Sequence, residues 1–84
     1  MKKLENNPKY HQAESLKEEL LIVIEKTMEK EGISQGEVAR RIGALRNNVN
    51  KIVRRKLPVS VDFLLKMAES IGLEVELKIR KLKS

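Results

Sequence analysis

The 84-residue chain has no cysteine and no tryptophan, and Tyr10 and Phe63 are its only aromatic residues. Without cysteine, neither a disulfide framework nor a thiolate metal site can form. The only histidine, His11, has no second ligand at metal-binding spacing, and the chain contains neither a glycine-rich phosphate loop nor an evident pair of catalytic carboxylates. We therefore expect no metal, no cofactor and no enzymatic activity, and a small core built from aliphatic side chains.

Long apolar runs are also missing. No apolar stretch reaches the roughly 18 residues that a membrane span needs, and no secretion-signal pattern opens the chain. Apolar residues nevertheless make up 40% of the chain, which is enough to fold it. We therefore expect one soluble, cytoplasmic domain without a membrane partner.

Acidic residues are absent from one stretch, Val38 to Val61, which contains seven basic residues. The whole chain has 18 Lys+Arg and 12 Asp+Glu, so the remainder is close to neutral, with 11 basic and 12 acidic residues. Scattered charges would indicate a merely soluble basic protein, whereas this clustering predicts an anionic partner such as nucleic acid. The seven basic residues are Arg40, Arg41, Arg46, Lys51, Arg54, Arg55 and Lys56.

Residues 1–14 are polar and lack periodicity, which predicts a flexible arm. Ser15 and Glu18 have the spacing of a capping box and predict the start of a helix. Apolar residues then recur every four positions, and Gly32 predicts the end of this helix. The apolar stripe consists of Leu16, Leu20, Ile24 and Met28.

A second helix is predicted directly afterwards by the same signals. Ser34 and Glu37 form another capping-box candidate, and Gly43 stands where the chain must turn sharply. The inward face of this short helix is predicted to be Val38, Ala39 and Ile42.

Two more helices follow. The third, which carries Val49, Ile52 and Val53 inward, must end before Pro58, because residues before proline disfavour helical backbone. Ser60 is predicted to cap the fourth. The predicted inward stripe of the fourth helix is Val61, Leu64, Leu65, Ala68 and Ile71, before Gly72.

After Gly72 the spacing of apolar residues changes, and every second residue is apolar. Apolar residues then alternate with Glu74, Glu76, Lys78 and Arg80, which predicts a half-buried strand. A lone strand leaves both edges unpaired, and its best available partner is the same strand of a second copy. The alternative is a tail that frays in solution. We therefore expect a homodimer whose dimerisation residues are Leu73, Val75, Leu77 and Ile79.

The segment from Ile33 to Arg54, ISQGEVARRIGALRNNVNKIVR, resembles the Xre/Cro-type helix-turn-helix module. The resemblance implies an all-α, five-helix-type domain, of which four helices are clear here, followed by the C-terminal β-strand. It divides the chain into a flexible arm (1–14), a helix-turn-helix domain (15–72) and a dimerisation strand with its tail (73–84). The landmarks are Ser34-Gln35, Val38-Ala39, Ile42-Gly43, Val49 and Ile52, with Pro58, Ser60, the Leu64–Ala68 run and Ile71-Gly72-Leu73 downstream.

The second helix of such a unit lies in the major groove, where arginine can bind guanine and asparagine can bind adenine. We expect base readout by its exposed residues, namely Arg46, Asn47, Asn48, Asn50 and Lys51. The resemblance also implies that DNA phosphates are held by Gln35, Arg54, Arg55 and Lys56. Arg40 and Arg41 are either further contacts or part of a solvated helix face.

The chain departs from the family pattern at Leu45, Val53 and Arg55. Leu45 replaces a small capping residue, so either the helix start is displaced or Leu45 packs inward. Arg55 stands where many members have glycine and Val53 where many have glutamate, which leaves the loop after the second helix open.

The helix-turn-helix followed by Gly-Leu-Glu-Val-Glu-Leu-Lys-Ile resembles the HigA-type antitoxin regulators of toxin–antitoxin operons. The resemblance implies a bacterial or phage, nucleoid-associated repressor of its own operon, with double-stranded DNA and a cognate toxin as partners. The alternatives are a stand-alone phage-type repressor and a protein-interaction module that neutralises a toxin without binding DNA. RNA binding is disfavoured, because the aromatic stacking platforms of common RNA modules are missing.

Overall fold

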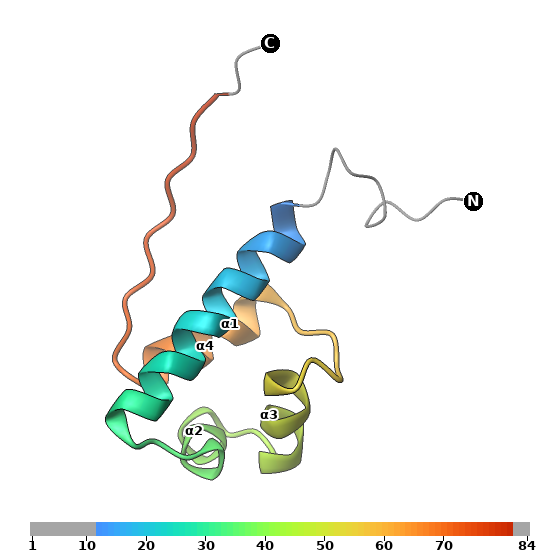
Figure 1. The fold of residues 1–84 in the computed structure, drawn as a ribbon, viewed down its shortest axis with the longest axis vertical. Coiled ribbons are helices and arrows are strands. Elements are labelled where there is room, and N and C mark those ends of the chain that lie inside the picture. Colours follow the sequence, from blue (N-terminus) through green and yellow to red (C-terminus); the bar gives the residue numbers. More distant parts are fainter. Residues whose placement is uncertain (1–11, 82–84) are drawn as a thin grey trace, which may run out of the picture.

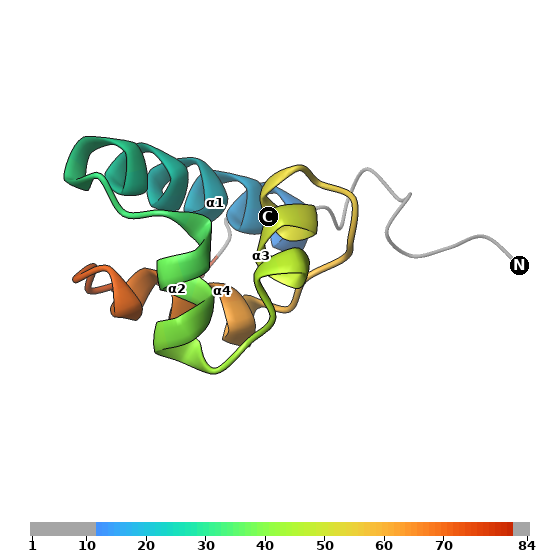
Figure 2. The same ribbon diagram turned by 90° about the horizontal axis from the view of Figure 1, so that it is seen from below.

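The computed structural model describes residues 12–81, and these residues form four α-helices (Figure 1). The helices are α1 (Gln12–Glu31), α2 (Gln35–Ile42), α3 (Arg46–Val53) and α4 (Val61–Ser70). α1 packs against α4, and α2 packs against both α3 and α4. In Figure 1 the α2–α3 pair lies below α1 and α4, and Figure 2 shows the two short helices side by side. The predicted four-helix, mostly helical fold is confirmed.

The core is aliphatic, with two methionines, and every helix contributes to it. Val38, Val49 and Leu64 are completely buried, each on the face that apolar spacing predicts. Within residues 12–81 no polar or charged side chain is buried, so the polar residues of α2 and α3 remain at the surface. The buried residues are Leu21, Ile24, Met28, Val38, Ala39, Val49, Ile52, Leu64, Met67, Ala68 and Ile71.

The helix ends follow the local sequence signals. The Ser34 hydroxyl accepts a hydrogen bond from the Glu37 N–H at 3.0 Å, and the Ser60 hydroxyl accepts one from the Phe63 N–H at 3.1 Å. Gly43 ends α2 with φ of 71°, in the left-handed region that glycine adopts without a steric penalty. The N-caps of α2 and α4 are therefore confirmed.

The predicted start of α1 is wrong. α1 begins at Gln12, so Ser15 lies inside the helix and does not cap it. Gln12 and Ala13 are good helix formers, and Glu14 lies favourably in the positively polarised first turn, which allows the helix to extend past the serine signal. The predicted arm falls mostly on residues 1–11, which lie outside the described residues, as do Tyr10 and His11.

Both alternatives predicted for Leu45, a displaced helix start and inward packing, are wrong. α3 begins immediately after it, at Arg46, so the helix start is not displaced. The Leu45 side chain is 69% exposed, so it does not pack inward. Because leucine has no hydrogen-bonding side chain, α3 begins without a side-chain cap.

The segment after Gly72 leaves α4 and runs as an extended chain beside α1 (Figure 1). Its last backbone hydrogen bond within the described residues joins the Leu73 N–H to the Ala68 carbonyl at 3.0 Å. Residues 73–81 are neither strand nor helix in the single chain, and residues 12–81 contain four helices, not the five of the resembling family's layout. The dimer strand stays a prediction, because a strand requires a neighbour.

No helix within residues 12–81 is both long and apolar enough to cross a membrane.

Candidate nucleic-acid interface

Helices α2 and α3 are joined by a short turn over residues 43–45. The turn is closed by a hydrogen bond from the Ala44 N–H to the Ala39 carbonyl at 2.8 Å. Val49 and Ile52 hold α3 against the core. The opposite face therefore points to solvent, and four of the five predicted base-reading residues on it are exposed: Arg46, Asn47, Asn48 and Lys51.

Asn50, the fifth predicted base reader, is half-buried and bonded to another predicted site residue. Its side-chain amide donates to the Gln35 side-chain oxygen at 2.8 Å. This bond ties α3 to the first turn of α2. The structure thus brings a predicted base reader and a predicted phosphate contact together, 15 positions apart in sequence.

Arg46 lies close to the same helix junction. A Cβ atom built on Gly36 would come within 3.5 Å of the Arg46 Cδ and 3.7 Å of its Nε, so the arginine stem lies beside the first turn of α2. Arg46, Asn47 and Asn50 also line one shallow surface hollow. Guanidinium and amide groups from α3 therefore gather beside the first turn of α2.

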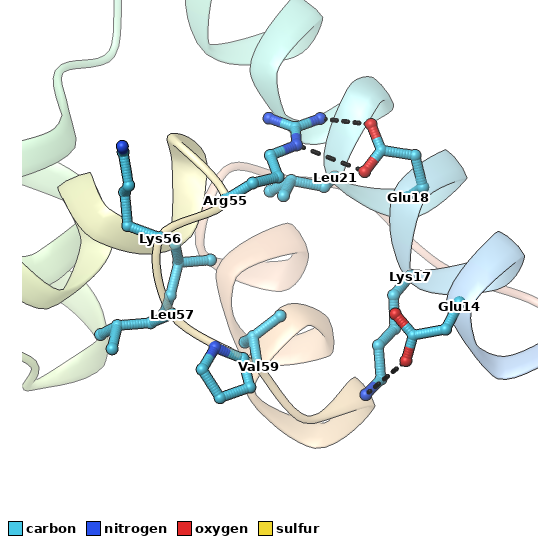
Figure 3. A pocket seen from close by; sticks show the side chains of 10 residues that line it. Glu14, Lys17, Glu18, Leu21, Arg55, Lys56, Leu57 and Val59 are labelled. Atoms are coloured by element: carbon cyan, nitrogen blue, oxygen red, sulfur yellow. Dashed lines mark hydrogen bonds and ion pairs between the residues drawn. The ribbon is translucent and has the colours of Figure 1, made fainter. Parts of the chain in front are cut away.

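Arg55 is directed away from this face, toward α1. Its backbone is left-handed, with φ of 59°, a conformation that glycine adopts more easily than arginine. The guanidinium donates to both Glu18 carboxylate oxygens, at 2.6 Å from Nη2 and 3.3 Å from Nε (Figure 3). Its Nη1 also donates to a Glu25 carboxylate oxygen at 2.5 Å. These bonds lower the pKa of Glu18, and Glu18 and then Glu25 raise the pKa of Arg55.

Arg40 and Arg41 share one carboxylate, that of Glu37. Arg40 donates to it from Nε at 3.1 Å and from Nη2, and Arg41 donates from Nε at 2.8 Å. Arg40 first and then Arg41 lower the pKa of Glu37 to about 2. Arg41 also donates to the Ser70 carbonyl at 2.7 Å, which joins α2 to the C-terminal end of α4.

Sequence reasoning missed these three carboxylate partners. Glu37 stands one residue before the acid-free stretch, and Glu18 and Glu25 come from a helix far away in sequence. The sequence held one signal for Arg55. In the resembling family this position often holds glycine, and a glycine position can have left-handed backbone, as Arg55 does. Four of the seven basic residues have no ion pair within the described residues. We call them the four unpaired cations: Arg46, Lys51, Arg54 and Lys56.

Two short helices that pack on the core, the second with a solvent-facing side rich in asparagine and cations, define a protein of the helix-turn-helix class. The chain matches the helix-turn-helix domain family over residues 7–80 and belongs to that family. Neither the curated proteins nor the solved structures provide a significant match. The family match covers all four helices and most of the extended segment that follows them.

Proposed function

We propose that this chain is a sequence-specific DNA-binding transcriptional regulator that acts as a repressor. One observation carries the proposal: Val49 and Ile52 fix α3 on the core, while its opposite face presents polar and cationic side chains to solvent. The major groove of B-DNA, about 12 Å wide, accepts one helix. α3 is the helix that we place there.

The exposed side chains of α3 have the chemistry of base readout. Arg46 can donate two hydrogen bonds to guanine O6 and N7, and Asn47 and Asn48 can each bind adenine bidentately. Lys51 can reach guanine acceptors or a phosphate. Asn50 has a double role in the proposal, because its bond to Gln35 holds the two helices in register while its carbonyl oxygen stays available to a base.

Phosphate contacts come from both ends of α3. Arg54 and Lys56 follow the helix and are exposed, and each can neutralise a phosphate. At the other end, the uncapped first turn of α3 leaves backbone N–H groups for an anion. Gln35, which is bonded to Asn50, is the further phosphate contact that we propose on α2. Because Arg55 is occupied by two carboxylates, we leave it out of the proposed phosphate contacts.

Two lysine-to-alanine variants, one on α3 and a control on α4, test the DNA interface. In electrophoretic or fluorescence titrations with a duplex from upstream of the gene, Lys51→Ala should weaken binding at least tenfold. Lys66→Ala removes the same charge from the exposed surface of α4 and should change affinity less than twofold. Equal losses in the two variants would mean that net charge, and not α3, directs binding.

We also propose that the regulator is an Xre/Cro-type homodimer, paired through residues 73–81. A dimer would present two copies of α3 to half-sites about one DNA turn apart, roughly 34–36 Å. The exposure of Leu77 and Ile79 in the single chain supports this arrangement, because pairing would cover these apolar side chains.

The antitoxin role is a proposal that rests on the resemblance of the C-terminal segment to HigA-type regulators. It predicts that the chain co-purifies with the product of a small neighbouring reading frame and protects cells from that product. A gene surrounded by phage functions, with no such neighbour, would instead indicate a stand-alone repressor. A toxin-binding chain without affinity for its own promoter would indicate a pure interaction module.

A further inference from the structure

An apolar groove of about 310 Å³ lies between the C-terminal segment and the α1–α4 pair. Leu16, Leu20 and Val23 line it from α1, and Val75 and Leu77 line it from the C-terminal segment. Leu16 and Val23 remain 41% and 47% exposed, so the segment covers α1 incompletely. Contiguous exposed apolar surface of this kind is characteristic of an interaction site.

The segment itself is also incompletely covered. Val75, Leu77 and Ile79 are 42%, 70% and 84% exposed, with exposure increasing along the chain. No backbone hydrogen bond reaches residues 74–81 from any other described residue. The segment therefore offers both an apolar side-chain row and unpaired backbone N–H and C=O groups, which together suit the addition of a strand.

The charges along the segment identify which strand would fit. Opposite residues of an antiparallel pair lie on the same face of the sheet, where opposite charges stabilise and like charges destabilise. When Leu77 is placed opposite Leu77 of a second copy, Glu74 faces Arg80 and Glu76 faces Lys78, and each of these pairs occurs twice. On the other face, Val75 lies opposite Ile79.

The other registers are poorer. A parallel, in-register pair would put every glutamate opposite a glutamate and every cation opposite a cation. An antiparallel pair centred on Glu76 or on Lys78 would put that charge opposite itself. A shift by a single residue would place apolar residues opposite charged ones, because side chains alternate between faces.

We propose that the segments of two copies form an antiparallel two-stranded ribbon whose two-fold axis passes through Leu77, and that this ribbon covers the groove of each copy. Ile79 of one copy then lies beside Val75 of the other and adds apolar contact above α1. The occupant of the groove is thus a second copy of this chain. The inference rests on the proposed homodimer and specifies its register.

Single cysteines test the register directly, since the chain has no cysteine of its own. In the full chain, Leu77→Cys should form a disulfide-linked homodimer at least ten times faster than Val75→Cys or Ile79→Cys alone. The two copies of position 75 would be about 14 Å apart along the ribbon, beyond the roughly 7 Å Cα separation that a disulfide can span. A mixture of the Val75→Cys and Ile79→Cys proteins should cross-link to each other.

Charge reversal provides the second test. Glu76→Lys puts a lysine opposite Lys78 in both symmetric pairs, and should raise the dimer dissociation constant roughly tenfold in sedimentation equilibrium. Lys78→Glu should do the same, and the Glu76→Lys/Lys78→Glu double variant should return to within about threefold of the native value. Glu69→Lys, on the exposed surface of α4, is the matched control and should leave the constant unchanged.

The outcomes separate the register from the proposed function. A stable dimer that cross-links fastest through position 75 or 79 alone, or a double variant that fails to recover, overturns the Leu77 register and leaves the homodimer standing. A native chain that sediments as a monomer at every concentration overturns both. Binding of the same proteins to duplex DNA, measured in parallel, shows whether the DNA-binding proposal survives either result.

Discussion

Arg55 links the loop after α3 to α1. Its left-handed backbone, with φ of 59°, costs a non-glycine residue about 1–2 kcal/mol. The contacts of its guanidinium with Glu18 and Glu25 offset this cost. The Arg55 side chain is 38% exposed, so we assign each ion pair only about 0.2–1 kcal/mol, the range measured for exposed pairs.

These magnitudes predict an unusual order of stability. Arg55→Ala loses both ion pairs and retains the left-handed backbone, so its free energy of unfolding should fall by about 1–2 kcal/mol. Arg55→Gly loses the same pairs but relieves the backbone, partly offset by the greater entropy of glycine in the unfolded chain. The glycine variant should therefore be about 1 kcal/mol more stable than the alanine variant.

Urea unfolding followed by circular dichroism measures both differences. Glu18→Gln removes one ion pair without altering the backbone of residue 55, and should therefore lower the free energy of unfolding by less than Arg55→Ala does. If Arg55→Ala is as stable as Arg55→Gly, the left-handed backbone has no measurable cost and the predicted order of stability is wrong. Arg55→Gly should also keep the salt dependence of DNA binding, because we assign no phosphate to Arg55.

The remaining predictions concern the core, the acid range and one phosphate contact. Leu64 is completely buried, so Leu64→Ala should reduce the free energy of unfolding in urea by about 2–5 kcal/mol, and a loss below 1 kcal/mol would show a loosely packed site. The pKa of Glu37 is lowered from 4.5 to about 2, so its stabilising contribution is complete above pH 4.5 and disappears as pH falls through 2. The thermal midpoint of Glu37→Gln should therefore fall less across that range than the native midpoint, and parallel curves would contradict this. Arg54→Ala should weaken binding to all duplexes alike and reduce the log–log salt slope by about 2 per dimer; a change confined to one sequence would instead indicate base readout.

The features that sequence reasoning predicted correctly depend on contacts three or four residues apart. Ser34 and Ser60 cap helices because each hydroxyl meets a backbone N–H three residues later. Gly43 ends α2 because glycine alone adopts left-handed backbone without a side-chain penalty. The start of α1 was missed because a serine signal is also compatible with a helix interior when the preceding residues favour helix.

The features that the sequence did not reveal depend on tertiary contacts. Arg55 meets Glu18 across 37 positions, Arg41 meets the Ser70 carbonyl across 29, and Asn50 meets Gln35 across 15. No local pattern encodes these separations. A count of charges along the chain therefore overestimates the cations available to DNA. Carboxylates of α1 pair with Arg55, and Glu37 pairs with both Arg40 and Arg41.

We propose above all that α3 and the cations beside it bind duplex DNA, with two copies of the chain on one operator. The most direct measurement is the affinity for a duplex from upstream of the gene, as a function of salt concentration. Two copies of the four unpaired cations would bring eight positive charges to the duplex and release about as many counterions, so we predict a log–log slope of about −7. A flat dependence on salt, or no binding at low salt, would contradict it.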